Sequence, residues 1–180
     1  AEHHVSHGAS TFLCSPFDEA AILTVDGVGE WATATQGVGR GNSMELFREI
    51  RFPHSLGLLY SAVTGYLGFK VNSAEYKVMG LAPYGAPKYV DAFHEVLDIA
   101  PDGSFRLNMD FFDFDWGMRM CNERFFELLG QPARDAEGPM EEFHKDVARS
   151  VQEIVNEVMV KQATALHEET GLKNLCMAGG

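Results

Sequence analysis

The apolar run AAILTV, residues 20–25, constrains the fold more than any other stretch of the sequence. It is partly β-branched and breaks at Asp26-Gly27, which predicts a buried strand followed by a tight turn. Residues 30–52 then contain two alternating stretches joined by a glycine-rich turn, the pattern of a β-hairpin. The three glycines of that turn, Gly37, Gly39 and Gly41, could instead cradle a phosphate, but they lie between two strands and no helix follows them directly, so we favour the turn.

After the hairpin the apolar residues recur at the period of a helix. Ser55 is a suitable N-cap for the first of these helices and Gly68 a suitable stop, while Pro139 and Gly171 suit the two ends of the longest one. The helices are expected at residues 56–67, 74–81, 90–97 and 139–171, with a short strand within 102–108 and a last strand in NLCMA before Gly179-Gly180. This order predicts a mixed α/β fold, a mixed sheet with flanking helices.

Composition narrows the class of protein. The chain has 180 residues, 46% of them hydrophobic, enough for the core of one domain or two small lobes. Its net charge of −12 argues against a nucleic-acid surface. We find no apolar run of about 18 residues and no leader pattern, so we expect no membrane partner and a cytoplasmic location. The three cysteines fit no metal or redox spacing and are expected to be reduced and mostly buried.

The N-terminal stretch EHHVSHGAS holds the first candidate site. On a helix, His3 and His7 share one face because they are four residues apart, whereas His4 points about 100° away. Such a pair can grip one metal ion, and a carboxylate would complete an iron-like site. A tag remnant or two hydrogen-bonded histidines of no chemical role are the alternatives.

Two further segments could bind a nucleotide. A carboxylate at a strand end beside Gly27 and Gly29 lets backbone N–H groups approach phosphate oxygens while Asp26 reaches a metal or a water. An ordinary Asp-Gly turn is the alternative there. In SAEYKVMGLAPYG, Glu75 and Lys77 lie on a helix that ends in glycine and proline, and a surface ion pair is the alternative.

Taken in order, five stretches closely resemble one enzyme family. They are EHHVSHGASTF, ILTVDGVGEW, FPHSLGLLYSAVTGYLGF, EYKVMGLAPYG and NLCMAGG, and they span residues 2–180. The family is that of the O-carbamoyltransferases of nodulation-factor and antibiotic biosynthesis, which resemble the tRNA threonylcarbamoyl-adenosine synthases. The resemblance implies an actin-like ATPase (ASKHA) fold with two related α/β lobes and a nucleotide cleft between them.

The resemblance also implies roles for individual residues. His3 and His7 match the metal-binding H-x-x-x-H motif, with iron(II) the usual ion and His4 a candidate base. Asp26, Gly27 and Gly29 match the phosphate turn. Glu75 and Lys77 fall where the family approaches ribose and adenine, and Gly179 and Gly180 match the start of its second nucleotide motif.

The family's chemistry supplies the expected cofactors and partners. Its members use ATP and carbamoyl phosphate to make a carbamoyl-adenylate and then transfer the carbamoyl group to a hydroxyl of a small-molecule acceptor, a sugar or an antibiotic. A homodimer is also expected. Transfer to tRNA is a rival within the enzyme class, and a non-catalytic nucleotide- and metal-binding module is the alternative outside it.

The resemblance further implies that residues 1–180 are the central portion of the transferase's N-terminal domain. The family's chain continues after Gly-Gly into an aspartate that serves as third metal ligand, and then into a separate domain. We therefore expect weak metal binding and no activity from these residues by themselves.

Overall fold

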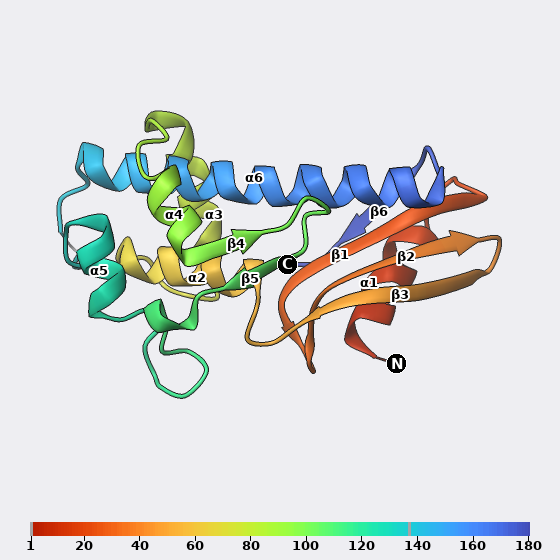
Figure 1. Ribbon diagram of the computed structural model, residues 1–180, viewed down its shortest axis with the longest axis horizontal. Helices are drawn as coiled ribbons and strands as arrows, with labels where there is room; N and C mark the ends of the chain where they lie inside the picture. The colour runs from red at the N-terminus through yellow and green to blue at the C-terminus, as the bar shows by residue number, and fades with distance from the viewer. Residues whose placement is uncertain (1, 137) are drawn as a thin grey trace. The chain divides into compact units, whose positions relative to one another are not determined.

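The computed structural model describes residues 2–136 and 138–180. These residues form two compact units (Figure 1). Unit 1 contains the residues up to Gly57 together with 100–105 and 158–180, and unit 2 contains 58–99 and 106–157. The α/β class with a mixed sheet and flanking helices is confirmed.

Unit 1 is built around a four-stranded mixed sheet in the order β3-β2-β1-β6 (Figure 1). The first three strands are antiparallel neighbours, and β6 pairs with β1 in parallel. Its elements are α1 (His3–Phe12), β1 (Glu19–Gly29), β2 (Ala32–Arg40), β3 (Ser43–Arg51), β6 (Leu175–Ala178) and the C-terminal part of α6 (Glu142–Thr170). The expected hairpin and final strand are therefore confirmed.

Strand β1 is buried on both of its faces. Side chains alternate along a strand, so Ile22 packs with Phe12 of α1 while Leu23 packs with Leu166 of α6. The four residues from Ala20 to Leu23 are at most 3% exposed. This two-sided burial explains why the run is continuously apolar instead of alternating.

Strand β1 does not turn at Asp26-Gly27, so that expectation was wrong. The strand continues to Gly29 with a register shift against β2 between Val25 and Gly29, and the chain reverses at Glu30, whose φ is 57°. The hydroxyl of Ser55 donates hydrogen bonds to the carbonyls of Asp26 and Gly27, at 3.2 and 2.6 Å, and holds this irregular segment. A contact 28 residues away in sequence thus overrides the local turn preference of Asp-Gly.

The β2–β3 connection needs only one of the three glycines expected to form it. Gly41, with φ 56°, makes the turn, whereas Gly37 and Gly39 lie within β2. Gly39 faces Phe12, and a Cβ atom built on it would lie 2.4 Å from that ring. A bare backbone at this position lets α1 lie directly on the sheet.

Unit 2 is mainly helical. Its helices are most of α2 (Leu56–Tyr66), α3 (Glu75–Leu81), α4 (Val90–Val96), α5 (Glu123–Leu129) and the N-terminal part of α6. Strand β4 (Leu97–Ile99) pairs with β5 (Phe105–Leu107) in a two-stranded sheet. The unit also contains two short 3₁₀ turns. Its core is aromatic, since Tyr66 and Phe93 both pack on Phe125 with ring centroids 5.5 and 6.3 Å away. Within the described residues, unit 2 does not repeat the sheet of unit 1.

Sequence reasoning missed α5 and misplaced the start of α6. Helix α5 is capped by the side chain of Asn122 and ends at Gly130, whose φ is 81°. Both residues are typical helix-end signals, but the aromatic residues of this region show no clear helical period, so the helix was not predicted. Helix α6 starts at Glu142, three residues after Pro139. The cysteine expectation holds for Cys121 and Cys176, which are buried, but Cys14 is exposed. None of the helices described has the length and apolarity needed to cross a membrane.

The close contact between α1 and the sheet yields a stability test. We expect Gly39→Ala to destabilise the fold by about 1–3 kcal/mol, because the added methyl group must displace the Phe12 ring in a packed core. Gly80→Ala is the control, since nothing lies within 4 Å of a Cβ atom there and alanine favours its helix. Denaturant unfolding of both variants measures the difference, and equal midpoints would refute the tight contact.

Candidate functional site

His3, His7 and Asp26 converge at one point of unit 1. The Oδ2 atom of Asp26 lies 2.5 Å from Nε2 of His3 and 3.0 Å from Nε2 of His7. The two Nε2 atoms are themselves 3.0 Å apart. Among the described residues, these three are the group of His, Cys, Asp and Glu side chains whose ligand atoms lie close enough to hold one ion.

Backbone geometry produces this convergence. The two histidines project from one face of α1, as their spacing predicts, and Asp26 follows the buried part of β1. Gly29 makes room for the first imidazole, because a Cβ atom there would lie 2.3 Å from the His3 ring. Glu30 accepts a hydrogen bond from the backbone N–H of His3 at 3.2 Å and so fixes the first turn of α1.

The environment of Asp26 favours its ionised form. Burial by itself would raise the pKa of this carboxyl group, but hydrogen bonds from His3, Gly27 and His7 outweigh burial and hold the pKa below its ordinary value. The side chain is 18% exposed, and those of His3 and His7 are 41% and 27% exposed. An anionic oxygen facing two imidazole nitrogens, all reachable from solvent, suits cation binding.

The donor set fits a divalent transition metal. Neighbouring ligands of an octahedral ion with bonds of about 2.1 Å are about 3.0 Å apart, which matches the Nε2–Nε2 and His7–Asp26 separations. Two histidines and one carboxylate on one side of an ion, with the other positions open, are the ligand set of many non-haem iron(II) sites. The residues present can therefore hold the expected ion.

The terminal glycines lie at the same edge of the sheet. Strands β1 and β6 are parallel, so their carboxyl ends meet, and ligands of α/β sheets commonly bind at such an edge. Gly179 has φ 137°, and a Cβ atom on it would overlap the carbonyl of Val25. A Cβ atom on Gly180 would lie 3.7 Å from Oδ1 of Asp26, the oxygen that accepts a hydrogen bond from the N–H of Gly27.

His4 lies beside the cluster, with ring centroids 5.5 Å from His3 and 6.0 Å from His7, but its ring nitrogens bond to the sheet. It is 4% exposed, its Nδ1 lies 2.6 Å from the hydroxyl of Thr24, and its Nε2 lies 2.9 Å from the carbonyl of Ala32. Burial lowers the pKa of His4, which favours the neutral ring. Because both ring nitrogens are already hydrogen-bonded, the geometry does not favour the base role, which stays a prediction.

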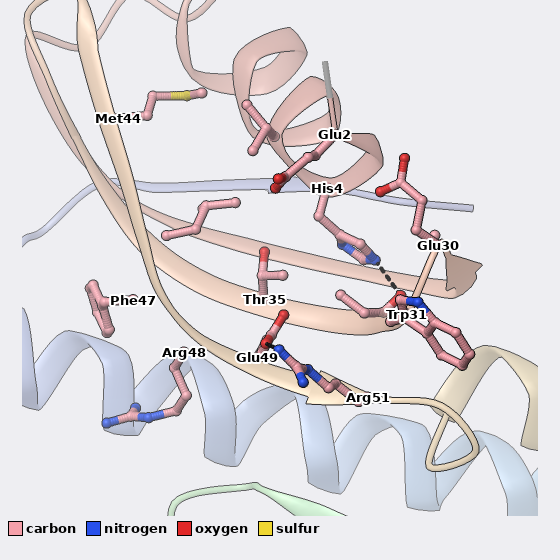
Figure 2. A pocket seen from close by; sticks show the side chains of 14 residues that line it. Glu2, His4, Glu30, Trp31, Thr35, Met44, Phe47, Arg48, Glu49 and Arg51 are labelled. Atoms are coloured by element: carbon pink, nitrogen blue, oxygen red, sulfur yellow. Dashed lines mark hydrogen bonds and ion pairs between the residues drawn. The ribbon is translucent and has the colours of Figure 1, made fainter.

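An open groove of about 840 Å³ lies on the β3 side of α1 (Figure 2). Thr35 and His4 lie toward its floor, and Trp31, 71% exposed, stands at one end beside Glu30. Its volume is within the range of small-molecule sites.

Glu75 and Lys77 belong to unit 2, whereas His3, His7 and Asp26 belong to unit 1. The carboxylate of Glu75 accepts hydrogen bonds from the hydroxyl of Ser61 at 2.9 Å and from the N–H of Asn72 at 2.7 Å. Burial alone would raise the pKa of Glu75, but hydrogen bonds to the carboxylate, beginning with that from Asn72, lower it. The Lys77 ammonium lies 5.8 Å from the centre of the Phe69 ring. These contacts support the loop before α3, and roles toward a nucleotide remain predictions.

Sequence reasoning missed two features of the cluster. It gave Asp26 a possible contact with a metal but did not join this carboxylate to the two histidines. The further aspartate ligand expected beyond Gly180 stays a prediction. Sequence reasoning also missed Glu30 and Ser55, whose side chains hold the ends of the segment around Asp26. No local pattern marks either contact, because each joins residues more than 25 positions apart.

Comparison with known proteins fits this arrangement. The family described as carbamoyltransferase N-terminus matches residues 1–180. The chain belongs to this family. The domain is 54% identical to an uncharacterized protein of Synechocystis sp. over 99% of its residues and 29% of the relative's length.

Two relatives of this carbamoyltransferase domain have a described role. Nodulation protein NolNO of Sinorhizobium fredii is 35% identical, and nodulation protein NolO of Bradyrhizobium diazoefficiens is 31% identical, each over 99% of the domain. The aligned residues cover 25% and 30% of those proteins. The chain thus spans between a quarter and a third of the length of these relatives.

The ionisation of Asp26 predicts a pH effect on the metal-free protein. Because the folded state lowers the pKa of Asp26, its carboxylate stabilises the fold above the ordinary value of 3.8, and this contribution is lost as the pH falls through the lower folded-state pKa. We expect the urea midpoint of Asp26→Asn to fall less than that of the wild type between about pH 5 and about pH 3.

Urea unfolding in the presence of a chelator provides the measurement. Asp110→Asn is the control, because the Asp110 carboxylate is exposed and its ion pair with Arg124 lies at the surface. That variant should follow the wild type across the range. The same acid loss in Asp26→Asn as in the wild type would mean that the histidine–aspartate contacts do not stabilise the fold.

Proposed function

We propose that the chain forms the metal-binding core of an ATP-dependent carbamoyltransferase. The full-length protein would convert ATP, carbamoyl phosphate and water into a carbamoyl-adenylate, releasing pyrophosphate and phosphate. It would then pass the carbamoyl group to a hydroxyl of a small-molecule acceptor, releasing AMP. The observation that carries the proposal is the convergence of His3, His7 and Asp26 beside Gly179-Gly180 in a chain of the carbamoyltransferase family. Membership of the carbamoyltransferase family does not by itself say which residues of the chain take part in the reaction.

The metal site would be formed by the two imidazoles and the Asp26 carboxylate. When bound, a divalent ion, expected to be iron(II), supplies positive charge that neutralises phosphate oxygens. Both imidazoles must be neutral to coordinate, and Asp26 remains the anionic ligand. Gly29 would keep His3 in place by leaving space for its ring, and Glu30 would do so by accepting a hydrogen bond from its backbone N–H.

The glycines would admit the nucleotide. With no side chains at Gly27 and Gly180, a phosphate could approach the backbone near Asp26, and the N–H of Gly27, which donates to Oδ1 of Asp26 in the structure, would be one donor to it. The carboxyl ends of parallel β1 and β6 support a nucleotide position at this edge and, more broadly, an actin-like ATPase fold for the whole protein. Glu75 and Lys77 are proposed to approach ribose and adenine.

The decisive assay measures AMP formed from ATP by the full-length protein with and without carbamoyl phosphate. We expect carbamoyl-phosphate-dependent AMP formation in the wild type and a reduction of about 10- to 100-fold or more in Asp26→Asn, because one metal ligand is lost. Asp110→Asn changes an exposed carboxylate of unit 2 and should retain full activity.

The assay also separates the alternatives. ATP binding without carbamoyl-phosphate-dependent AMP would contradict the enzyme proposal and support a non-catalytic nucleotide- and metal-binding module. Transfer of a threonylcarbamoyl group to tRNA, in place of carbamoyl transfer to a small hydroxyl compound, would support the tRNA-modifying branch. Equal activity of Asp26→Asn and the wild type would exclude the cluster from the reaction.

A further inference from the structure

We propose that His4, Thr24 and Thr35 form a buried hydrogen-bonded clamp that positions His3 and His7 for metal binding. His4 is then a positioning residue that never touches the substrate. The inference rests on the metal site of the proposed function and adds residues that hold its geometry.

The clamp is a continuous chain of short hydrogen bonds between α1, β1 and β2. Nδ1 of His4 lies 2.6 Å from Oγ1 of Thr24, which lies 2.6 Å from Oγ1 of Thr35. Thr24 and Thr35 face each other directly in the β1–β2 register. Nε2 of His4 closes the chain on the carbonyl of Ala32, where β2 begins.

The carbonyl of Ala32 determines which atoms donate and which accept along this series of hydrogen bonds. A carbonyl only accepts, so Nε2–H of His4 donates to Ala32. In the neutral ring Nδ1 is then an acceptor for the Thr24 hydroxyl, whose oxygen accepts from Thr35. Every polar atom of the clamp has a partner, although the three side chains are at most 5% exposed.

The clamp fixes the rotation of α1 about its own axis. Successive helical residues are turned by about 100°, so once the His4 ring is fixed against the sheet, His3 and His7 must project toward one side. Thr24 and Asp26 are two residues apart on β1 and therefore point to the same face of the strand. Thr24, which binds His4, is thus the neighbour on that face of Asp26, the carboxylate that meets His3.

The first turn of α1 needs such support because its backbone N–H groups have no helical partners. Glu30 holds the N–H of His3 on one side, and the clamp holds the next residue on the other. Apolar side chains in place of His4, Thr24 and Thr35 could pack against the neighbouring core of Ile22 and Phe12. Hydrogen bonds in a buried, fully satisfied chain also fix the orientation of the groups that they join, which apolar packing does not.

The test uses cobalt(II) as a visible substitute for iron(II) in the full-length protein. Thr24→Val keeps the shape of the side chain but removes the hydroxyl, and we expect cobalt(II) affinity to fall about 10- to 100-fold with an altered ligand-field spectrum. Thr24→Ser restores the hydroxyl and should restore both affinity and spectrum. Titration followed by visible absorption measures each.

Thr33→Val is the matched control. Thr33 is equally buried in β2, and its hydroxyl donates to the carbonyls of Ile50 and His54, away from α1. This variant should lose thermal stability yet bind cobalt(II) as the wild type does. The comparison separates positioning of the ligands from general weakening of unit 1.

Each outcome bears on a different claim. Wild-type affinity and spectrum in Thr24→Val would overturn the clamp. Failure of the wild type to bind cobalt(II) would instead overturn the metal site of the proposed function. If Thr24→Val does not fold, Thr35→Val removes only the outer bond, and an affinity no weaker than that of Thr33→Val would overturn the clamp as well.

Discussion

The site depends on how closely α1 lies against the sheet. Two contacts set this distance, and each needs a residue without a side chain: Gly39 under Phe12 and Gly29 under His3. Added Cβ atoms would lie 2.4 and 2.3 Å from these partners. Because the helix lies this low, its two exposed imidazoles reach a carboxylate of the central strand instead of solvent alone.

The second constraint is the irregular end of β1. A regular strand would pair Asp26, Gly27 and Val28 with β2 and direct the chain onward, but the register shifts before Gly29 and Ser55 holds the displaced carbonyls. Bulges near the ends of strands re-aim side chains in this way. Asp26 stays on the α1-facing side of β1 that it shares with Thr24, and the parallel pairing of β6 brings Gly179-Gly180 to the same edge.

Sequence patterns predicted the elements whose signals are local. The apolar run of β1, the hairpin, the long helix and the final strand follow from periodicity and stop residues, and the His3–His7 pair follows from helical spacing alone. The contacts that create the site were not predictable in this way. Asp26 meets His7 across 19 residues and Ser55 meets Gly27 across 28, and such pairings are decided by packing of the whole unit. His4 shows the same limit, since its sequence neighbours suggest chemistry while its burial against Thr24 gives it structural hydrogen bonds.

Two histidines of α1 are proposed to bind one metal ion beside Asp26. X-ray absorption spectroscopy of the iron-loaded full-length protein tests it most directly, because the rings of bound imidazoles produce a characteristic outer scattering pattern. We predict two imidazoles among the iron ligands in the wild type and one in His7→Ala. Absence of imidazole scattering, sulfur ligands in its place, or a spectrum that His7→Ala leaves unchanged would contradict the claim.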